Sequence, residues 1–514
     1  MAEDILPYKI ELAESTGATS LAGLPAYMEL AHMLNLLASV AEHVHARENS
    51  QGWSDAQMVM SLVTLQIAGG ECVDDLKVLE GDDGFCRLLQ RMEVALLNLP
   101  RPERRRLQLQ WRKERKRSVP SPSSVFRFLH AFDVDESERQ AGKAWIPPLS
   151  EALKGLLLVN RDLLARVNAA NPQEEATLDI DATLVECFKK EALHCYKGFK
   201  SYQPLQVYWA EQDLLVHSEF RDGNVPAGHE ILRVLQEALD VLPESVRKVR
   251  VRSDSAAYQW DFLLYMARGT NERFGAIDFT VSADVTAEFR QAVGSVDESE
   301  WKPVVRPVLD SSGQVQKQAT DHEYAEVCYA PGQLSYSKSN PNVRFVAIRE
   351  RLKEKDQLLL PGVEAGQLTF PFPTMAMGSA HYKLHAIASN MHGMAASELI
   401  LWHWARCGKS EEVHAVLKND LAGGRMPSGD FGPNAAWWAI TVIAYNLNSA
   451  MKRLVLGGSW VRQRMKAIRF AFIRMSGRVI EHARHLVLRL TGNHPYANVL
   501  LHAREVMRTL AGQT

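Results

Sequence analysis

Three acidic residues lie in separate parts of the chain, each in a setting that could support chemistry. Asp181 follows apolar residues in LDIDAT, Asp254 follows the alternating run VRVRS, and Glu411 lies in GKSEEVHAVLK. Two aspartates at strand positions and a glutamate on a later helix can hold a pair of Mg²⁺ ions roughly 3.5–4 Å apart, which is the arrangement used to cut and join phosphodiesters. Our central hypothesis is therefore a two-metal carboxylate site.

The strand predicted around Asp181 carries a second acid on the same face. Side chains alternate between the two faces of a strand, so Asp179, Asp181 and Thr183 share one face. Two acids on one face repel each other and cost solvation energy unless a cation lies between them. Asp179 is therefore an accessory candidate, with the alternative that acids at a strand end simply face water.

The settings of the other two acids also have ordinary explanations. Asp254 ends a predicted strand and begins a helix, where it could serve only as the N-cap. Glu411 shares a helix face with His414 and Lys418, because seven residues make almost two turns. An acid for a metal and a lysine for a phosphate would serve one reaction, whereas a solvated polar face is the commoner alternative. Glu412, closer to the apolar side of the helix, is the rival to Glu411.

The elements that must position these acids change in character along the chain. Apolar residues spaced by three and four predict helices from about residue 24 to 164, and alternation predicts strands from residue 177. We predict an α/β fold with a mixed sheet and helices on its faces. The expected regions are a helical N-terminal domain (1–170), a core in two parts (171–286 and 379–450), a β-rich insertion between them (287–378) and a basic helical C-terminal region (451–514). Strands are predicted at 276–283, 324–329, 343–349, 367–372 and 381–388, and helices at 229–242 and 256–268.

Composition limits the class of protein. The 514 residues exceed the usual size of a single core, so two to four structural units are expected. Hydrophobic residues make up 46% and charged residues 23%, which is ordinary for a soluble globular protein and excludes global disorder. The six cysteines are scattered without a Cys-x-x-Cys pair, which favours neither a zinc site nor a disulfide framework. We expect a cytoplasmic protein, since neither a secretory signal nor an apolar run of ~20 residues is present.

Charge is unevenly distributed although the formal net charge is only -2. Two basic blocks, 101–117 and 452–489, flank a more acidic middle. The first block precedes a Ser- and Pro-rich break and a new helix, which is plausible for a DNA-docking element, with a solvated charged helix as the equal alternative. Its candidate phosphate-binding residues are Arg104, Arg105, Arg106, Arg112 and Lys113.

The segments around the three acids resemble bacterial insertion-sequence transposases of the DDE type, most closely the 1380 family, over roughly residues 177–447. The matching pieces are LDIDATLVE, YKGFKSYQPLQVYWAE, FRDGNVPAGHE, VRVRSDSAAY and GKSEEVHAVLKNDLAGGRMPSGDFGPNAAWWAITVIAYNLN. Related transposases carry a tyrosine, arginine, glutamate and lysine signature on the last helix. Glu411 and Lys418 fit its glutamate-to-lysine spacing, whereas Trp404 and Cys407 stand in the tyrosine and arginine places.

The resemblance implies an RNase H-like core in which Asp181, Asp254 and Glu411 bind two Mg²⁺ ions, or Mn²⁺ in their place. The implied activity is cleavage at terminal inverted repeats and strand transfer into target DNA. Glu412 and His414 are possible accessory residues.

The resemblance also implies partners. Double-stranded DNA, as terminal repeats and as target, would be bound by a homodimer or larger assembly. Lys418, Lys409 and Arg406, which is one residue from the arginine place, would hold phosphates near the cut. The two basic blocks would bind the repeats, with an affinity that falls steeply with salt. The expected location is the bacterial cytoplasm, in association with the nucleoid when DNA is bound.

Two alternatives remain open. The first is a catalytically silent DNA-binding protein derived from a transposase, which would have no chemical reason to keep all three acids. The second is a nuclease that cuts without joining, which strand-transfer products would distinguish.

Overall fold

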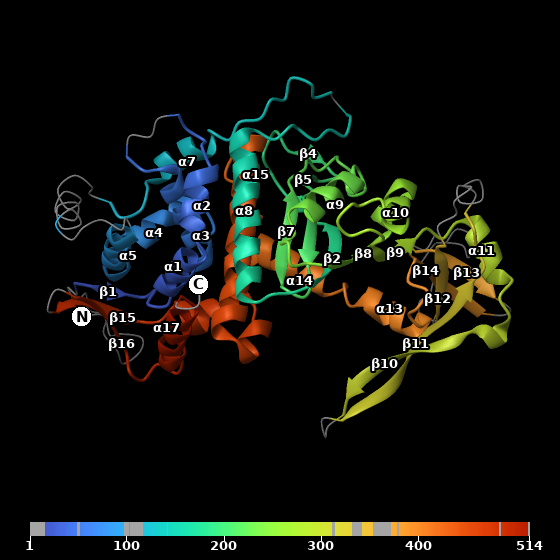
Figure 1. The fold of residues 1–514 in the computed structure, drawn as a ribbon. Coiled ribbons are helices and arrows are strands. Elements are labelled where there is room, and N and C mark those ends of the chain that lie inside the picture. The colour runs from blue at the N-terminus through green and yellow to red at the C-terminus, as the bar shows by residue number, and fades with distance from the viewer. Residues whose placement is uncertain are drawn as a thin grey trace, which may run out of the picture.

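A mixed β-sheet of ten strands runs through the part of the chain that the computed structural model describes (Figure 1). That part comprises residues 16–48, 52–96, 102, 117–140, 142–310, 314–331, 342–352, 372–377, 380–482 and 485–511. The sheet follows the order β10-β11-β12-β14-β9-β8-β2-β6-β7, with β13 beside β14. Its strands are β2 (Glu175–Ala182), β6 (Leu205–Trp209), β7 (Leu214–Glu219), β8 (Lys248–Ser253), β9 (Asp278–Ala283), β10 (Lys302–Leu309), β11 (Val315–Val327), β12 (Arg344–Arg351), β13 (Thr374–Met377) and β14 (Ala380–Ser389).

Five neighbouring strands form the core of the fold. Strand β2 pairs antiparallel with β6, and β6 with β7, while β8 lies parallel to β2 and β9 lies parallel to β8. The order β7-β6-β2-β8-β9, three antiparallel strands followed by two parallel ones, is the arrangement of an RNase H-like core. The predicted α/β class with a mixed sheet is therefore confirmed.

Helices pack against this core and bury its strands. The middle of β2, residues 176–180, is entirely buried, so both of its faces are covered. The covering helices include α8 (Glu151–Ala170), α9 (Ile231–Asp240), α10 (Trp260–Ala267) and α15 (Phe431–Ala450). Helices α8 and α15 lie side by side (Figure 1). Asn446 Nδ2 of α15 donates to Asn160 Oδ1 of α8 at 2.7 Å. Asn446 Oδ1 also accepts the Leu215 N–H at 2.8 Å, which fixes α15 to β7.

The predicted β-rich insertion extends the core sheet. Strand β14 pairs antiparallel with β9 of the core on one side and with β12 on the other. The strands predicted at 324–329, 343–349 and 381–388 are confirmed within β11, β12 and β14, whereas most of the one predicted at 367–372 lies outside the described residues. Helices α11 (Ala287–Gly294) and α13 (Ala396–Trp404) belong to the same part of the chain. The insertion is thus continuous with the core sheet.

The two ends of the chain pack together, with α17 in contact with α1 (Figure 1). The structure corrects the helical prediction for the C-terminal region, because β15 and β16 form an antiparallel hairpin to which β1 adds. The alternation in HLVLRL is a strand pattern, which explains the difference. These elements are α1 (Leu24–Met33), α2 (Leu36–His43), α3 (Asp55–Ala68), α4 (Leu76–Gly81), α5 (Asp83–Leu96), α7 (Pro122–Leu129), α16 (Met465–Ile468), α17 (Ala497–Ala511), β1 (Ala18–Thr19), β15 (Gly477–His482) and β16 (His485–Leu490).

Within the described residues, no single helix has the length and apolar character needed to cross a membrane. Two consecutive helical segments, Asp55–Ala68 and Val73–Gly81, meet that criterion only together and are bent by 91°. Most residues of Asp55–Ala68 are buried in the protein core.

Candidate active site

Asp181 and Asp254 lie at the carboxyl ends of two adjacent parallel strands. Ile180 of β2 lies opposite Ser253 of β8, so the next residues along the two strands, Asp181 and Asp254, are neighbours. The Ser253 hydroxyl donates to the Ile180 carbonyl at 3.0 Å and holds this register. Asp254 is also the N-cap of the 3₁₀ helix Ser255–Ala257, in which its carboxylate accepts a backbone N–H at 3.0 Å. Asp254 therefore caps this helix and also lies next to Asp181.

Glu411 lies in the first turn of α14 (Lys409–Ala415) and faces the same place. Its carboxylate accepts the backbone N–H of Gly408, so it caps its own helix. Gly408 has a φ of +76°, a left-handed conformation that glycine adopts without steric cost. The negative charge of Glu411 is felt at Asp181, where it raises the pKa. The structure thus places Asp181 and Asp254 side by side, with the charge of Glu411 acting on Asp181.

The electrostatics of Asp181 combine burial, two neighbouring negative charges and one opposing arginine. Burial, together with the charges of Asp254 and Glu411, raises the pKa of Asp181 to about 7 against the opposing effect of Arg406. Arg406 Nη1 lies 3.3 Å from Asp181 Oδ2. A cation beside these carboxylates would relieve their repulsion and keep all three ionised.

The three candidate carboxylates are chemically suitable ligands for divalent metal ions. Carboxylate oxygens are the ligands that Mg²⁺ and Mn²⁺ prefer. In the described structure, however, no group of three or more His, Cys, Asp or Glu side chains is close enough together to hold an ion. Asp181 pairs with Arg406 and Glu411 is bound to Gly408, which accounts for the open arrangement.

Asp179 is bound by an arginine that the sequence did not single out. Its oxygens accept Arg252 Nε at 2.6 Å and Nη2 at 2.9 Å, and both side chains are buried. Arg252 Nη1 donates to the Trp402 carbonyl of α13 at 2.7 Å. Asp179 is thus engaged in an ion pair two residues before Asp181. The sequence signal that could have identified Arg252 is the alternation in VRVRSD, which places Arg252 on the same strand face as Asp254.

Arg406 reaches the site from the turn between α13 and α14. Its side chain is buried, yet its Nε has no hydrogen-bond partner within the described part of the chain. A buried guanidinium with an unused donor beside a candidate catalytic carboxylate is suited to take an additional oxygen, such as one of a phosphate.

Lys409 and Glu412 lie on another side of α14. Lys409 Nζ lies 3.2 Å from Asp213 Oδ1 and 3.6 Å from Glu412 Oε2. Asp213 also accepts Lys452 Nζ at 2.7 Å, and this cluster is internal. The structure therefore engages the partly exposed ammonium of Lys409 in an ion pair with the buried Asp213.

His414 and Lys418 follow Glu411 along the chain. His414 is buried, and burial together with the charges of Lys418 and Arg406 lowers its pKa to about 4 against the opposing effect of Glu411. Lys418 lies in a π-helical segment, Val416–Asp420, and its Nζ donates to the carbonyl of Leu184, three residues after Asp181. Lys418 also lines a cavity of about 350 Å³ together with Arg425 and Lys466. Glu71 also lines this cavity and lies 2.9 Å from Arg425, so three bases and one acid face it.

A second cavity, of about 480 Å³, lies between the core and the insertion. Asp254, Arg406 and His385 line it on the core side, and His322 lines it on the insertion side. The insertion therefore forms one wall of the space beside the predicted acids.

Most of the first basic block, 101–117, lies outside the described residues, whereas most of the second, 452–489, is described. The predicted residues Arg104, Arg105, Arg106, Arg112 and Lys113 lie outside the described residues. In the second block Lys452 is buried against Asp213, and Arg469 is buried with its guanidinium donating to the carbonyls of Gln66 and Ile67. Part of that block therefore joins the C-terminal helices to the core and to α3.

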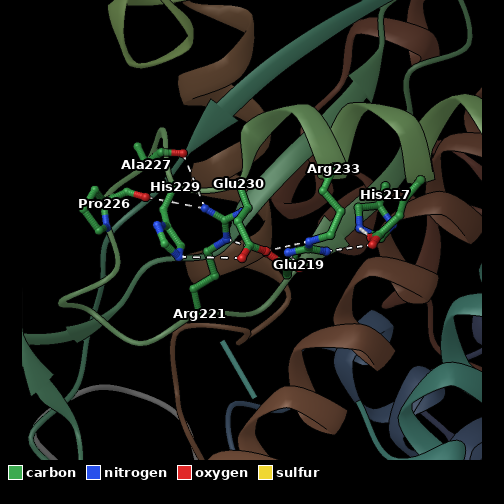
Figure 2. Close-up of polar contacts among 9 residues, drawn as sticks. His217, Glu219, Arg221, Pro226, Ala227, His229, Glu230 and Arg233 are labelled. Atoms are coloured by element: carbon green, nitrogen blue, oxygen red, sulfur yellow. Dashed lines mark hydrogen bonds and ion pairs between the residues drawn. The ribbon is translucent and has the colours of Figure 1, made fainter. Parts of the chain in front are cut away.

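The piece FRDGNVPAGHE forms a buried charge network after β7 (Figure 2). Arg221 is fully buried and its Nε donates to Glu219 Oε1 at 2.6 Å, while the other Glu219 oxygen accepts Arg233 Nη2 at 2.5 Å. Arg233 of α9 also donates to Glu230 and Glu237, each at 2.7 Å. The network binds the end of β7 to the first turns of α9.

This network supports the turn that carries Asp254. Arg221 Nη1 lies 3.5 Å and 3.4 Å from the carbonyl oxygens of Pro226 and Ala227 (Figure 2). The next residue, Gly228, offers its carbonyl to Gln259 Nε2 at 2.6 Å, just after the 3₁₀ helix that Asp254 caps. A Cβ at Gly228 would lie 2.4 Å from the Ala256 carbonyl oxygen, so only glycine permits this approach.

An RNase H-like core with carboxylates at the ends of neighbouring parallel strands defines a class of enzymes that act on nucleic acids. The model of the family described as Transposase DDE domain group 1 matches residues 9–511, and the chain belongs to this family. Its function is therefore that of a DDE transposase.

A solved structure titled as the piggyBac transposase synaptic complex with hairpin DNA shares 9% identity with the chain. The similarity covers 97% of this chain and 83% of that one, with a TM-score of 0.38. A TM-score below 0.5 does not establish a common fold, so the RNase H-like fold is assigned from the order of the strands in the sheet. No curated protein matches the sequence.

Proposed function

We propose that the chain cuts DNA at the terminal inverted repeats of a mobile element and joins the ends to target DNA. The observation that carries this proposal is the meeting of Asp181 and Asp254 at adjacent strand ends, with the charge of Glu411 acting on the same place. Two carboxylates at adjacent strand ends, with the charge of a third acting on Asp181, repel one another unless a cation is part of the function.

The three acids would hold two Mg²⁺ ions, or Mn²⁺. When bound, the ions supply charge stabilisation for an attacking water or DNA 3′-hydroxyl and for the leaving oxygen. For Glu411 to join such a site, its carboxylate must leave the Gly408 N–H. Arg406 and Lys418 would orient phosphates, one through its unpaired Nε and the other from the cavity beside Leu184.

The more specific parts of the proposal concern the element and the assembly. We propose a bacterial insertion sequence of the 1380 family, because the motifs VRVRSDSAAY and GKSEEVHAVLKNDLAGG stand at the second and third acids. Action on two DNA ends calls for a homodimer or larger assembly.

Cleavage of labelled DNA that carries the flanking ends of the element tests the proposal. Wild-type protein should cut only with Mg²⁺ or Mn²⁺, whereas Asp181→Ala, Asp254→Ala and Glu411→Ala should bind DNA without cutting. Glu412→Ala, changed at the adjacent position, and Asp74→Ala, which removes an exposed acid of the N-terminal region, are the matched controls and should cut normally. Normal cutting by Glu411→Ala with failure of Glu412→Ala would refute the third assignment.

The same assay separates the alternatives. Binding without cutting by the wild-type protein would favour a silent DNA-binding protein. Cutting without strand-transfer products would favour a nuclease that does not join.

A further inference from the structure

A short sheet directly after Asp181 carries aromatic and lysine side chains on its outer surface. Its strands β3 (Val185–Glu186), β5 (Lys200–Tyr202) and β4 (Leu193–His194) pair in the order β3-β5-β4, and residues 185–202 are called the ribbon below. Phe188 is 89% exposed and Tyr196 is 77% exposed. Exposure of two aromatic rings so close together in the chain costs hydration free energy that a partner would recover.

The ribbon is anchored on its inner side, so the outward direction of these rings is not a consequence of loose packing. Cys187, Ala192, Cys195 and Tyr202 are buried. The Tyr202 hydroxyl accepts Asn434 Nδ2 of α15 at 3.1 Å. The ribbon is therefore a folded element with one packed face and one free face.

Three lysines lie close to the two rings in the chain, as do the exposed acids Glu186 and Glu191. Lys189, Lys190 and Lys197 are exposed, and Lys197 Nζ lies 5.7 Å from the centre of the Tyr196 ring. The charge of Lys197 also reaches Lys418, whose pKa is lowered by burial and by this neighbour. Lys418 in turn lines the cavity that also holds Arg425, Lys466 and Glu71.

The ribbon begins close to Asp181, which would bind the reacting phosphate. Three residues separate Asp181 from Val185, so their Cα atoms are at most about 14 Å apart. Lys418 Nζ donates to the Leu184 carbonyl within this connection. DNA whose phosphate reaches Asp181 must therefore pass close to the base of the ribbon.

We propose that the ribbon binds unpaired bases of DNA next to the cleavage site, with Phe188 and Tyr196 stacking on bases and the lysines contacting phosphates. This inference rests on the proposed function, because it places the reacting phosphate at Asp181. Aromatic rings combined with cations are the means by which proteins hold single-stranded nucleic acid. A fully paired duplex offers few free base faces, so the ribbon distinguishes unpaired from paired DNA.

Fluorescence anisotropy with two labelled oligonucleotide duplexes tests this role. One duplex is fully paired and the other has unpaired central thymines, and the protein carries Asp181→Ala so that the DNA is not cut. We expect tighter binding of the unpaired duplex, and a loss of roughly tenfold in that affinity when Phe188→Ala and Tyr196→Ala are added. Binding of the paired duplex should change little. Equal affinities before and after these substitutions would overturn the proposal.

Two controls complete the test. Leu501→Ala removes an apolar side chain that is 56% exposed on α17, outside both basic blocks, and should leave both affinities unchanged. Lys189→Gln, Lys190→Gln and Lys197→Gln together should lower the slope of log affinity against log salt, by about one for each lysine that binds a phosphate in the wild-type protein. If Phe188→Ala and Tyr196→Ala instead abolish self-association and leave DNA binding intact, the ribbon is a protein interface and the proposal is wrong.

The outcome is separable from the proposed function. If the wild-type protein cuts with Mg²⁺ while the ribbon variants bind both duplexes as their parent does, the ribbon proposal fails and the transposase proposal stands. If the ribbon variants lose the preference for unpaired DNA but the wild-type protein never cuts, the transposase proposal fails and base binding by the ribbon stands.

Discussion

The guanidinium of Arg252 contacts both oxygens of Asp179, at 2.6 Å and 2.9 Å. Asp179 lies two residues before Asp181, and Arg252 lies two residues before Asp254. The same guanidinium donates to the Trp402 carbonyl, in the helix that precedes the turn to Glu411. One buried ion pair therefore ties together all three elements that lead to the candidate acids.

Arg252→Met should lower the free energy of unfolding by roughly 3–5 kcal/mol, because Asp179 is then buried without a partner. Urea denaturation at neutral pH measures the change. Arg250→Met is the matched control on the same strand, since Arg250 pairs with the half-exposed Glu175 and such pairs contribute about 0–1 kcal/mol. Equal losses for the two variants would show that the buried pair has no special role.

Gly228→Ala should slow DNA cleavage by roughly 100-fold, because a Cβ only 2.4 Å from the Ala256 carbonyl must displace the turn that carries Asp254. Single-turnover cleavage rates measure the effect. Gly81→Ala adds the same methyl group where no atom lies within 4 Å and should cut at the wild-type rate. An unchanged rate in Gly228→Ala would mean that the turn does not depend on this contact.

Lys418 and Lys409 should behave differently although the sequence predicted the same role for both. Lys418→Gln should weaken DNA binding and reduce the salt slope by about one, since its ammonium lines a basic cavity. Lys409→Gln should instead lower the free energy of unfolding by about 1–3 kcal/mol, because Asp213 then has one cation fewer beside it. Anisotropy and urea denaturation on both variants separate the two effects. A binding defect in Lys409→Gln without loss of stability would contradict this assignment.

Acid should remove the stabilisation that Asp213 provides. Burial acts to raise the pKa of Asp213, but Lys452 and Lys409 outweigh it and lower the pKa from 3.8 to about 2. Because the folded pKa is below the unfolded one, this stabilisation is complete above pH 3.8 and is lost as the pH falls towards 2. The stability difference between wild type and Asp213→Asn should shrink by roughly 2 kcal/mol over that range. Asparagine tolerates the φ of 55° at this position, so the backbone is no obstacle. A difference that does not vary with pH would contradict the ion-pair explanation.

Local pattern was sufficient for much of the fold. Alternation predicted the strands that became β9, β11, β12 and β14, and apolar spacing predicted α9 and α10, because each signal depends on which side of one element is buried. The C-terminal hairpin was missed, although HLVLRL alternates, because short alternating runs also occur within helical surroundings.

The sequence by itself determined the three candidate acids, since acids in a strand, at a strand end and on a later helix are visible in LDIDAT, VRVRSD and GKSEEV. Only the tertiary structure decided their neighbours. It assigned Asp179 to Arg252, paired Lys409 with Asp213, placed Arg406 against Asp181 and brought Gly228 under the Asp254 turn. The physical reason is that a charged side chain is stabilised by whichever opposite charge the packing brings within reach, and strand pairing across dozens of residues sets that distance.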